Sequence, residues 1–279
     1  MIRMKRSRDS ASVDGLNHDY LDLHIDSFRA GIEHLLKIDP TLKEIIEHSP
    51  FTMFLKENVA KESMEFYFNK LASSIISQQI SGTAAKNIRG RIVDMFDGNF
   101  PNYKTLHETF QNNEEKQALK DCGLSQRKLG YIESLVDYFY NSEDDIKDLF
   151  ENATDEKILE ELVANIKGIG PWSAKMFLIT GLHRLNVFAA DDLGIARGCS
   201  RYFEERPEVL KELQSKRTLI RKSKIKHKNY KWKIHDEDIV ELCGDLFDPH
   251  RTLFMFVLWR MSDINMDVVI NNEKRFMSK

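Results

Sequence analysis

The stretch GIGPWSAKMFLITGLHRLNVFAADDLGIARG, residues 168–198, decides the fold predicted for this chain. It begins with a glycine-rich turn and closes with two adjacent aspartates, Asp191 and Asp192, inside an apolar, glycine-flanked turn. Gly168 and Gly170 permit a turn that residues with a Cβ would resist. Pro171 then stands at a first helical position, where its missing N–H costs nothing. The stretch predicts a tight turn, a helix and a carboxylate pair.

A second helix is predicted immediately before the turn. Thr154 precedes two acidic residues, as the start of a helix favours, and Ile158, Leu162 and Ile166 repeat every four residues. Two helices joined by this turn make a helix–hairpin–helix, whose second helix offers free backbone N–H groups to an anion. Backbone contacts of this kind hold a nucleic acid strand without reading its sequence. The alternative is an ordinary glycine turn between two helices.

Bulk composition limits the other possibilities. The 279 residues are 42% hydrophobic and carry a formal net charge of −3, so any nucleic-acid affinity must come from a local patch. Three widely spaced cysteines show no disulfide framework, zinc pattern or iron–sulfur spacing, which is typical of a reducing intracellular compartment. No apolar run approaches the roughly 20 residues of a membrane span. We therefore expect no membrane association.

Outside the hairpin the pattern is helical almost throughout. Strong amphipathic or apolar helices are predicted over 23–36, 61–78, 83–96, 126–140 and 251–261. No alternating run is long enough to indicate a sheet, so the predicted fold class is all-α. Residues 1–16 are polar and aperiodic and are interpreted as a disordered basic tail. Its KRSR sequence, residues 5–8, indicates either a nuclear import signal or a tail that is basic by chance.

Composition shifts sharply between about 207 and 235. The segment KRTLIRKSKIKHKNYKWK, residues 216–233, contains no acidic residue and interleaves Tyr230 and Trp232 with lysines. Its cations are Lys216, Arg217, Arg221, Lys222, Lys224, Lys226, Lys228, Lys231 and Lys233. The segment is interpreted either as a phosphate-contacting basic insertion or as a solvated linker between two helices.

Several segments together resemble a known family. IKGIGPWSAK followed by VFAADDLGI is similar to the helix–hairpin–helix (HhH-GPD) DNA glycosylase superfamily, in its alkylated-base (3-methyladenine) branch. LASSIISQQISGTAAKNI (71–88), GLSQRKLGYI (123–132) and FDPHRTLFMFVLWRM (247–261) resemble further blocks of the family, in the family's order. The pattern is most similar to the compact fungal type. The resemblance implies two interleaved helical lobes, about 17–62 plus 185–279 and about 63–184, with a DNA-binding cleft between them in a single domain, 17–279.

The resemblance assigns the catalytic carboxylate to Asp192. Breaking an N-glycosidic bond builds positive charge on the sugar, which a carboxylate in a dry site stabilises, and the carboxylate can also orient or deprotonate the attacking water. Asp191 is expected to cap the following helix or to brace the turn. Without the hairpin upstream, the pair would be interpreted as simple helix capping.

Trp172 is informative by its identity. In the lyase-competent branch of the superfamily the matching position carries a lysine that attacks the sugar and forms a Schiff base. Trp172 cannot do this, which implies hydrolysis by water and an uncut abasic site. The indole could also stack on a flipped cationic purine; the alternative is that it belongs to the hairpin core. Lys175 is interpreted as solvated or phosphate-facing.

The polar break SQQISG supplies further implied DNA contacts. The resemblance makes Gln79 the wedge that fills the gap left by the flipped base, with Gln78 supporting it and Ser81 facing the minor groove. The alternative is that the glutamines cap the end of a helix. A bulkier wedge or a histidine at these places in some relatives leaves the breadth of substrate open.

The same resemblance implies that a phosphate and a cation bind at the hairpin. The Gly170 N–H and the Ser173 hydroxyl would meet the phosphate. A structural Na⁺ or K⁺ would be held by the carbonyls of Ala164, Ile166 and Gly168, while the chemistry itself would need no cofactor. Arg251 and Trp259 are interpreted as structural because their neighbours are apolar.

The sequence therefore predicts a monomeric, nuclear, monofunctional glycosylase that excises alkylated purines, chiefly 3-methyladenine and also 7-methylguanine, from duplex DNA. Two alternatives stay open. A bifunctional or mismatch glycosylase of the same fold is disfavoured by Trp172 and by the missing cluster cysteines. A non-catalytic module that binds DNA or abasic sites is disfavoured by Asp192 and by the intact QQ segment.

Overall fold

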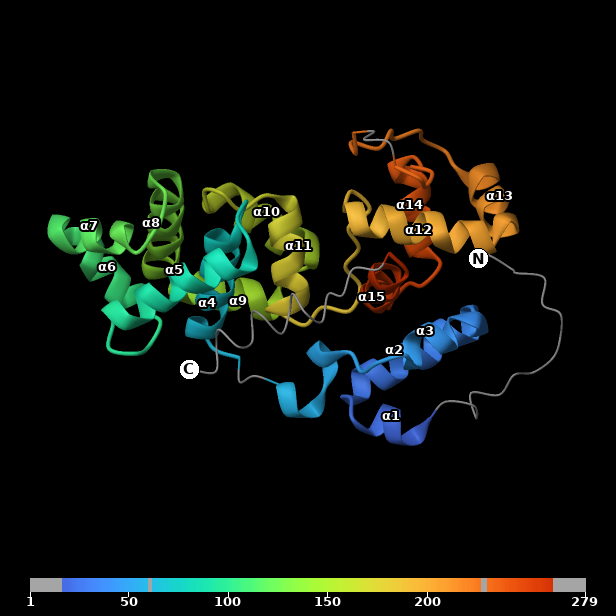
Figure 1. Cartoon of the computed structure of the whole chain (residues 1–279), viewed down its shortest axis with the longest axis horizontal. Coiled ribbons are helices and arrows are strands. Elements are labelled where there is room, and N and C mark those ends of the chain that lie inside the picture. Colours follow the sequence, from blue (N-terminus) through green and yellow to red (C-terminus); the bar gives the residue numbers. More distant parts are fainter. Residues whose placement is uncertain (1–16, 60–61, 227–229, 263–279) are drawn as a thin grey trace. The chain divides into compact units, whose positions relative to one another are not determined.

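A computed structural model describes residues 17–59, 62–226 and 230–262. The tail 1–16, including KRSR, lies outside this part of the chain. The described residues are predominantly helical and contain no strand; one isolated bridge pairs His24 with Leu55 (Figure 1). The predicted all-α fold is confirmed. None of the described helices is long and apolar enough to cross a membrane.

The chain divides into two compact units. Within the described part, unit 1 comprises 17–59 and 185–262, and unit 2 comprises 62–184. The α-helices of unit 2 are α4 (Met64–Ser77), α5 (Gly82–Met95), α6 (Tyr103–Gln111), α7 (Asn113–Asp121), α8 (Gln126–Asn141), α9 (Glu143–Asn152), α10 (Asp155–Asn165) and α11 (Pro171–Thr180). Those of unit 1 are α1 (His18–Asp22), α2 (Asp26–Ile38), α3 (Lys43–Glu47), α12 (Leu193–Glu205), α13 (Pro207–Lys216), α14 (Glu237–Asp245) and α15 (Arg251–Met261), with short 3-10 turns η2 (Pro40–Leu42), η3 (Thr52–Phe54) and η4 (Lys56–Asn58).

Unit 2 is built around α8, against which α4 and α6 pack. Three aromatic rings, one from each helix, meet in its core: Phe68, Tyr103 and Phe139 have centroids 5.5–5.7 Å apart. All three are fully buried. The helices α10 and α11 lie side by side (Figure 1). Aromatic packing thus holds α8 against α4 and α6, and the hairpin between α10 and α11 is bound to α8.

Unit 1 is built on the packing of α12 against α15. The approach is close at Gly198, where an added Cβ would lie 2.2 Å from the Leu258 carbonyl oxygen. Phe254 of α15 stacks on Phe247 at 3.8 Å and meets Tyr202 of α12 edge-on at 5.4 Å. Glycine is required at position 198 because any side chain would push the two helices apart.

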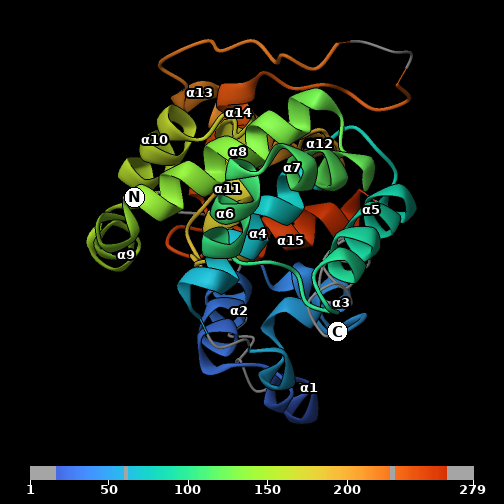
Figure 2. The ribbon, with the colours of Figure 1, turned by 90° about the vertical axis from the view of Figure 1, so that its left-hand side faces the viewer.

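The basic segment joins α13 to α14. Its first residue, Lys216, is the last residue of α13, and the residues that follow form an irregular stretch (Figure 2). Its described part has no regular secondary structure after Arg217. The composition shift that begins near 207 therefore includes a whole helix, α13, and only the remainder is a connection.

Candidate functional site

The predicted helix–hairpin–helix is present in unit 2. Helix α10 ends at Asn165, Gly168 takes a φ of +83°, and Gly170 is the N-cap residue of α11, with Pro171 in the first turn. A Cβ at Gly168 would lie 2.2 Å from Cδ2 of Tyr131. Gly170 brings no side-chain cap to α11. The start of a helix is where an anion is favoured, and no side chain of the cap residue occupies this one.

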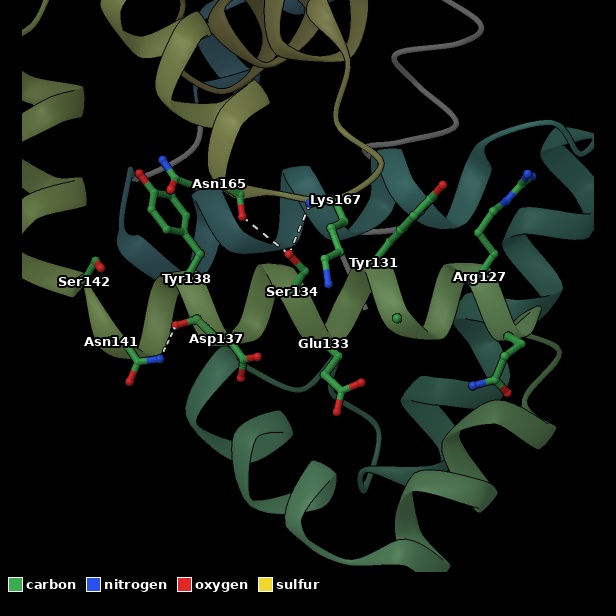
Figure 3. Close-up of a pocket in the computed structure, with 12 residues that line it drawn as sticks. Arg127, Tyr131, Glu133, Ser134, Asp137, Tyr138, Asn141, Ser142, Asn165 and Lys167 are labelled. Atoms are coloured by element: carbon green, nitrogen blue, oxygen red, sulfur yellow. Dashed lines mark hydrogen bonds between the residues drawn. The ribbon is translucent and has the colours of Figure 1, made fainter.

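The hairpin rests on one face of α8. The Ser134 hydroxyl accepts a hydrogen bond from the Lys167 backbone N–H at 3.1 Å and donates one to the Asn165 carbonyl at 3.4 Å (Figure 3). An open groove of about 570 Å³ follows this face from Arg127 to Ser142. Its lining mixes both charge signs, so the groove alone does not define an anion site.

The QQ segment is connected directly to the hairpin. Gln78 is the C-cap residue of α4, and its side-chain Nε2 donates to the Gly168 carbonyl at 2.9 Å. Gln79 is exposed, has a positive φ of 60°, and accepts a hydrogen bond from Arg127 at 2.8 Å. Ser81 caps α5 by accepting from the Ala84 N–H. The structure thus brings Gln78 and Gly168 together and presents Gln79 to solvent.

Helix α8 also holds the end of α4. The Lys128 ammonium donates to the Ile76 carbonyl at 2.5 Å, and the side chain is 7% exposed. Burial lowers the pKa of Lys128, and the neighbouring Arg127 charge lowers it further. Sequence reasoning gave no role to Arg127, Lys128 or Tyr131. The resemblance of block 123–132 was the only signal that pointed to them.

The remaining hairpin residues differ in accessibility. Trp172 is 44% exposed, so the alternative that it belongs to the hairpin core is wrong. Ser173, expected to meet a phosphate, is only 9% exposed. Lys175 is half-buried on α11. Their roles toward DNA stay predictions.

The carbonyls expected to hold a cation are partly engaged. Gly168 O accepts from Gln78, and Ile166 O accepts from the Ile169 N–H at 3.2 Å. A carbonyl oxygen has two lone pairs, so each retains one further acceptor position. The site with Ala164 stays a prediction. In the described part of the chain no cluster of three His, Cys, Asp or Glu side chains suits a metal ion.

Asp192 belongs to unit 1 and is the N-cap residue of α12. Its Oδ1 accepts two hydrogen bonds at 3.0 Å, one from the Ile195 backbone N–H and one from the Trp259 indole Nε1–H. The expectation that Asp191 caps this helix is wrong: Asp192 provides the cap, and Asp191 is exposed. Two donors on one oxygen fix the orientation of the Asp192 carboxylate at the positive end of the helix.

Trp259 is a core residue, 2% exposed, as its apolar neighbours predicted. Its second role, as donor to Asp192, was not found from the sequence, because the two residues are 67 positions apart. The close approach of α12 and α15 at Gly198 brings them together. The carboxylate is therefore aligned by the core of unit 1.

The segment that leads to Asp192 is fixed on α15. The buried Thr252 hydroxyl accepts from the Val187 N–H at 2.9 Å, and the Thr252 N–H donates to the Leu185 carbonyl at 3.0 Å. Arg251 donates to the side chain and the carbonyl of Asn186, both at 3.0 Å. These bonds agree with the structural role expected for Arg251, and they hold the backbone before the aspartate pair.

Comparison with known proteins identifies the family of this chain. Residues 72–222 match the HhH-GPD superfamily of base excision DNA repair proteins. The chain is 48% identical to the DNA-3-methyladenine glycosylase of Saccharomyces cerevisiae over 94% of this chain and 89% of that protein. It is 26% identical to DNA-3-methyladenine glycosylase 1 of Schizosaccharomyces pombe over 83% of this chain and 86% of that protein.

Two solved structures share the fold. A 3-methyladenine DNA glycosylase of Schizosaccharomyces pombe in complex with abasic DNA aligns with a TM-score of 0.56 and 25% identity, covering 84% of this chain and 97% of that one. A DNA-3-methyladenine glycosidase of Bacillus halodurans aligns with a TM-score of 0.59 and 25% identity, covering 83% and 88%. The fold, the family match and the named relatives together define a DNA glycosylase. This chain belongs to the HhH-GPD superfamily of base excision DNA repair proteins.

Proposed function

We propose that this chain is a monofunctional DNA glycosylase that excises alkylated purines, 3-methyladenine and 7-methylguanine, from duplex DNA and leaves an abasic site. The observation that carries the proposal is the Asp192 carboxylate, held at the N-terminus of α12 by the buried Trp259 indole. Relatives named as DNA-3-methyladenine glycosylases, one 48% identical, support it. So does the abasic DNA bound by the related Schizosaccharomyces pombe protein.

The chemistry follows from the charge that develops on the sugar. An enzyme that acts on a base must first take it out of the stack, at a cost of a few kcal/mol. As the N-glycosidic bond breaks, the sugar becomes cationic, and the fixed Asp192 carboxylate stabilises it and orients the attacking water. A cationic alkylated purine is already a good leaving group, so no strong general acid and no cofactor are required.

The hairpin residues suit hydrolysis. Trp172 has no amine with which to attack the sugar, and its exposed indole offers an aromatic face to an electron-poor base. Gln79 is exposed, has a positive φ and accepts a side-chain hydrogen bond from Arg127, and it is the proposed wedge that fills the place of the flipped base. The N–H groups at the start of α11 bind the phosphate backbone.

The proposal includes a monomeric state and a nuclear location, the latter supported by KRSR at residues 5–8. Light scattering of the enzyme with and without DNA tests the first. For the second, fluorescence of a tagged chain is compared with that of a variant in which Lys5, Arg6 and Arg8 are glutamine. A stable dimer would overturn the first statement, and exclusion of the wild-type chain from the nucleus would overturn the second. Unchanged nuclear retention of the variant would show that KRSR is not the signal.

A single-turnover release assay tests the activity. Methylated duplex DNA is incubated with wild type, Asp192→Asn and the matched control Asp191→Asn, which removes the same charge one residue earlier. We expect 3-methyladenine release by wild type, strand breaks only after alkali, and a rate reduced at least about 100-fold for Asp192→Asn alone. Binding of methylated or abasic DNA without base release would show instead a non-catalytic module. Strand cleavage without alkali would show a bifunctional enzyme.

A further inference from the structure

The basic segment between α13 and α14 has two parts with different electrostatic surroundings. We call residues 217–222 the inner stretch, and Lys224, Lys226, Lys231 and Lys233 the outer lysines. The whole of 216–233 lacks acidic residues in a chain whose net charge is −3. The surroundings of each part decide whether its charge is available to a partner.

The inner stretch is neutralised by the start of α14. Arg217 donates to Asp238 at 2.8 and 2.9 Å and to Asp236 at 3.0 Å. Arg221 pairs with Glu237 at 2.9 Å, and its backbone N–H donates to Asp238 at 2.8 Å. The Arg221 carbonyl accepts from the Glu237 N–H at 2.7 Å. These bonds anchor the inner stretch and consume its charge.

The outer lysines differ from the inner stretch in their exposure and in their ion pairing. All four are exposed. None has an ion-pair partner among the residues that the structure describes. Their four positive charges are therefore exposed to solvent next to the anchored inner stretch, although the protein as a whole has a net negative charge. A solvated linker would need no such separation of paired and unpaired cations.

Two aromatic rings stand among the outer lysines. Tyr230 and Trp232 stack with their centroids 5.0 Å apart and an angle of 25° between the rings. The stack places both rings on one side of the chain, and Lys231 and Lys233 alternate with them in sequence. The lysines supply the charge that neutralises duplex phosphates, and the mutual stacking of the two rings holds the chain that carries Lys231 and Lys233.

We propose that the outer lysines and the Tyr230–Trp232 stack form a second DNA-binding surface, separate from the hairpin, that binds the phosphate backbone of undamaged duplex. The proposal rests on the proposed function, because it takes DNA as the partner. Its effect is on the search for lesions: a glycosylase meets mostly undamaged DNA, and a sequence-independent electrostatic attraction raises its residence there. The surface takes no part in base removal.

The salt dependence of binding tests this surface. The affinity of the full-length protein for an undamaged 25-base-pair duplex is measured by fluorescence anisotropy between 50 and 200 mM KCl. A variant with all four outer lysines replaced by glutamine is compared with wild type. The matched control replaces four other exposed lysines by glutamine: Lys37, Lys56, Lys147 and Lys211. Single-turnover release of 3-methyladenine at saturating enzyme is measured for all three proteins.

The slope of log K against log salt is negative, and for the outer-lysine variant we expect it to become shallower. The change should be about 0.9 for each phosphate that the variant no longer neutralises, about two to four phosphates in total. The release rate at saturation should equal that of wild type. The variant Tyr230→Leu/Trp232→Leu keeps all four lysines, so its slope should equal that of wild type. An unchanged slope in the outer-lysine variant, or an equal change in the control, would overturn the proposal. Absence of base release by wild type would refute the proposed function and leave the binding result to be judged separately.

Discussion

Substituting the two hairpin glycines one at a time tests whether the turn requires glycine at one position and tolerates a side chain at the other. Gly168 has a φ of +83°, and a Cβ there would lie 2.2–2.6 Å from three atoms of the Tyr131 ring. Gly170, two residues later, has a φ of −100° and no atom within 4 Å of an added Cβ. Gly168→Ala and Gly170→Ala are thus the same chemical change in the same turn, and only the first is opposed by the structure.

The expected cost of Gly168→Ala has two parts. A left-handed conformation costs a residue with a Cβ about 1–2 kcal/mol. Displacing the Tyr131 ring adds the cost of overpacking, about 1–3 kcal/mol. The reduced entropy of the unfolded chain returns about 0.4–1 kcal/mol. The free energy of unfolding should fall by about 2–4 kcal/mol for Gly168→Ala and stay within about 0.5 kcal/mol of wild type for Gly170→Ala.

Urea denaturation followed by circular dichroism measures both changes, and a double-mutant cycle divides the larger one. In a Tyr131→Ala background, Gly168→Ala should cost only the backbone part, about 1 kcal/mol, and the difference is the steric coupling. Equal stability losses for Gly168→Ala and Gly170→Ala would refute the reasoning. A Gly168→Ala cost that is independent of Tyr131 would refute its steric half.

Two further predictions concern the other unit. Trp259→Phe keeps most of the buried volume and removes one hydrogen bond to the Asp192 carboxylate, a bond worth about 1.5–3 kcal/mol; single-turnover base release should therefore slow by roughly tenfold or more while DNA affinity is unchanged. His235 is 7% exposed, and burial, with a smaller effect of the Lys233 charge, lowers its pKa from 6.5 to about 4. Between pH 6.5 and about pH 4, His235 is protonated in the unfolded chain and neutral in the folded chain. Stability should therefore fall with decreasing pH through this window, by up to about 3 kcal/mol at pH 4, and His235→Asn should lack that part of the fall in urea denaturation.

Each of these predictions has a clear contrary result. A Trp259→Phe enzyme with the wild-type release rate would show that Ile195 alone orients the carboxylate. If wild type and His235→Asn lose equal stability between pH 7 and pH 4, the imidazole titrates alike in the folded and unfolded chains.

Local chemistry carried much of the fold prediction. Apolar residues every three or four positions predict helices, and glycine and proline mark their ends, because both signals act over one or two turns of backbone. Where these local signals gave a wrong helix boundary, a segment distant in sequence bonds to the backbone. A helix was predicted over 23–36, yet α2 begins at Asp26. Before α2 the backbone pairs instead with a distant segment: the Ile25 N–H donates to the Phe54 carbonyl at 2.9 Å, and the Leu23 carbonyl accepts from the Lys56 N–H at 3.0 Å.

The sequence by itself determined the helical class, the hairpin, and the identity of the aspartate pair and the QQ segment, because each depends on residues close together in the chain. Only the tertiary structure decided that Asp192, and not Asp191, caps α12, that Trp259 holds its carboxylate, and that Gln78 bonds to Gly168. It also showed that, among the described residues of the basic segment, the inner stretch is ion-paired and the outer lysines are not. The Trp259–Asp192 and Gln78–Gly168 hydrogen bonds join residues 67 and 90 positions apart. Packed helices set them, and no local pattern records which side chains that packing will bring within hydrogen-bonding distance.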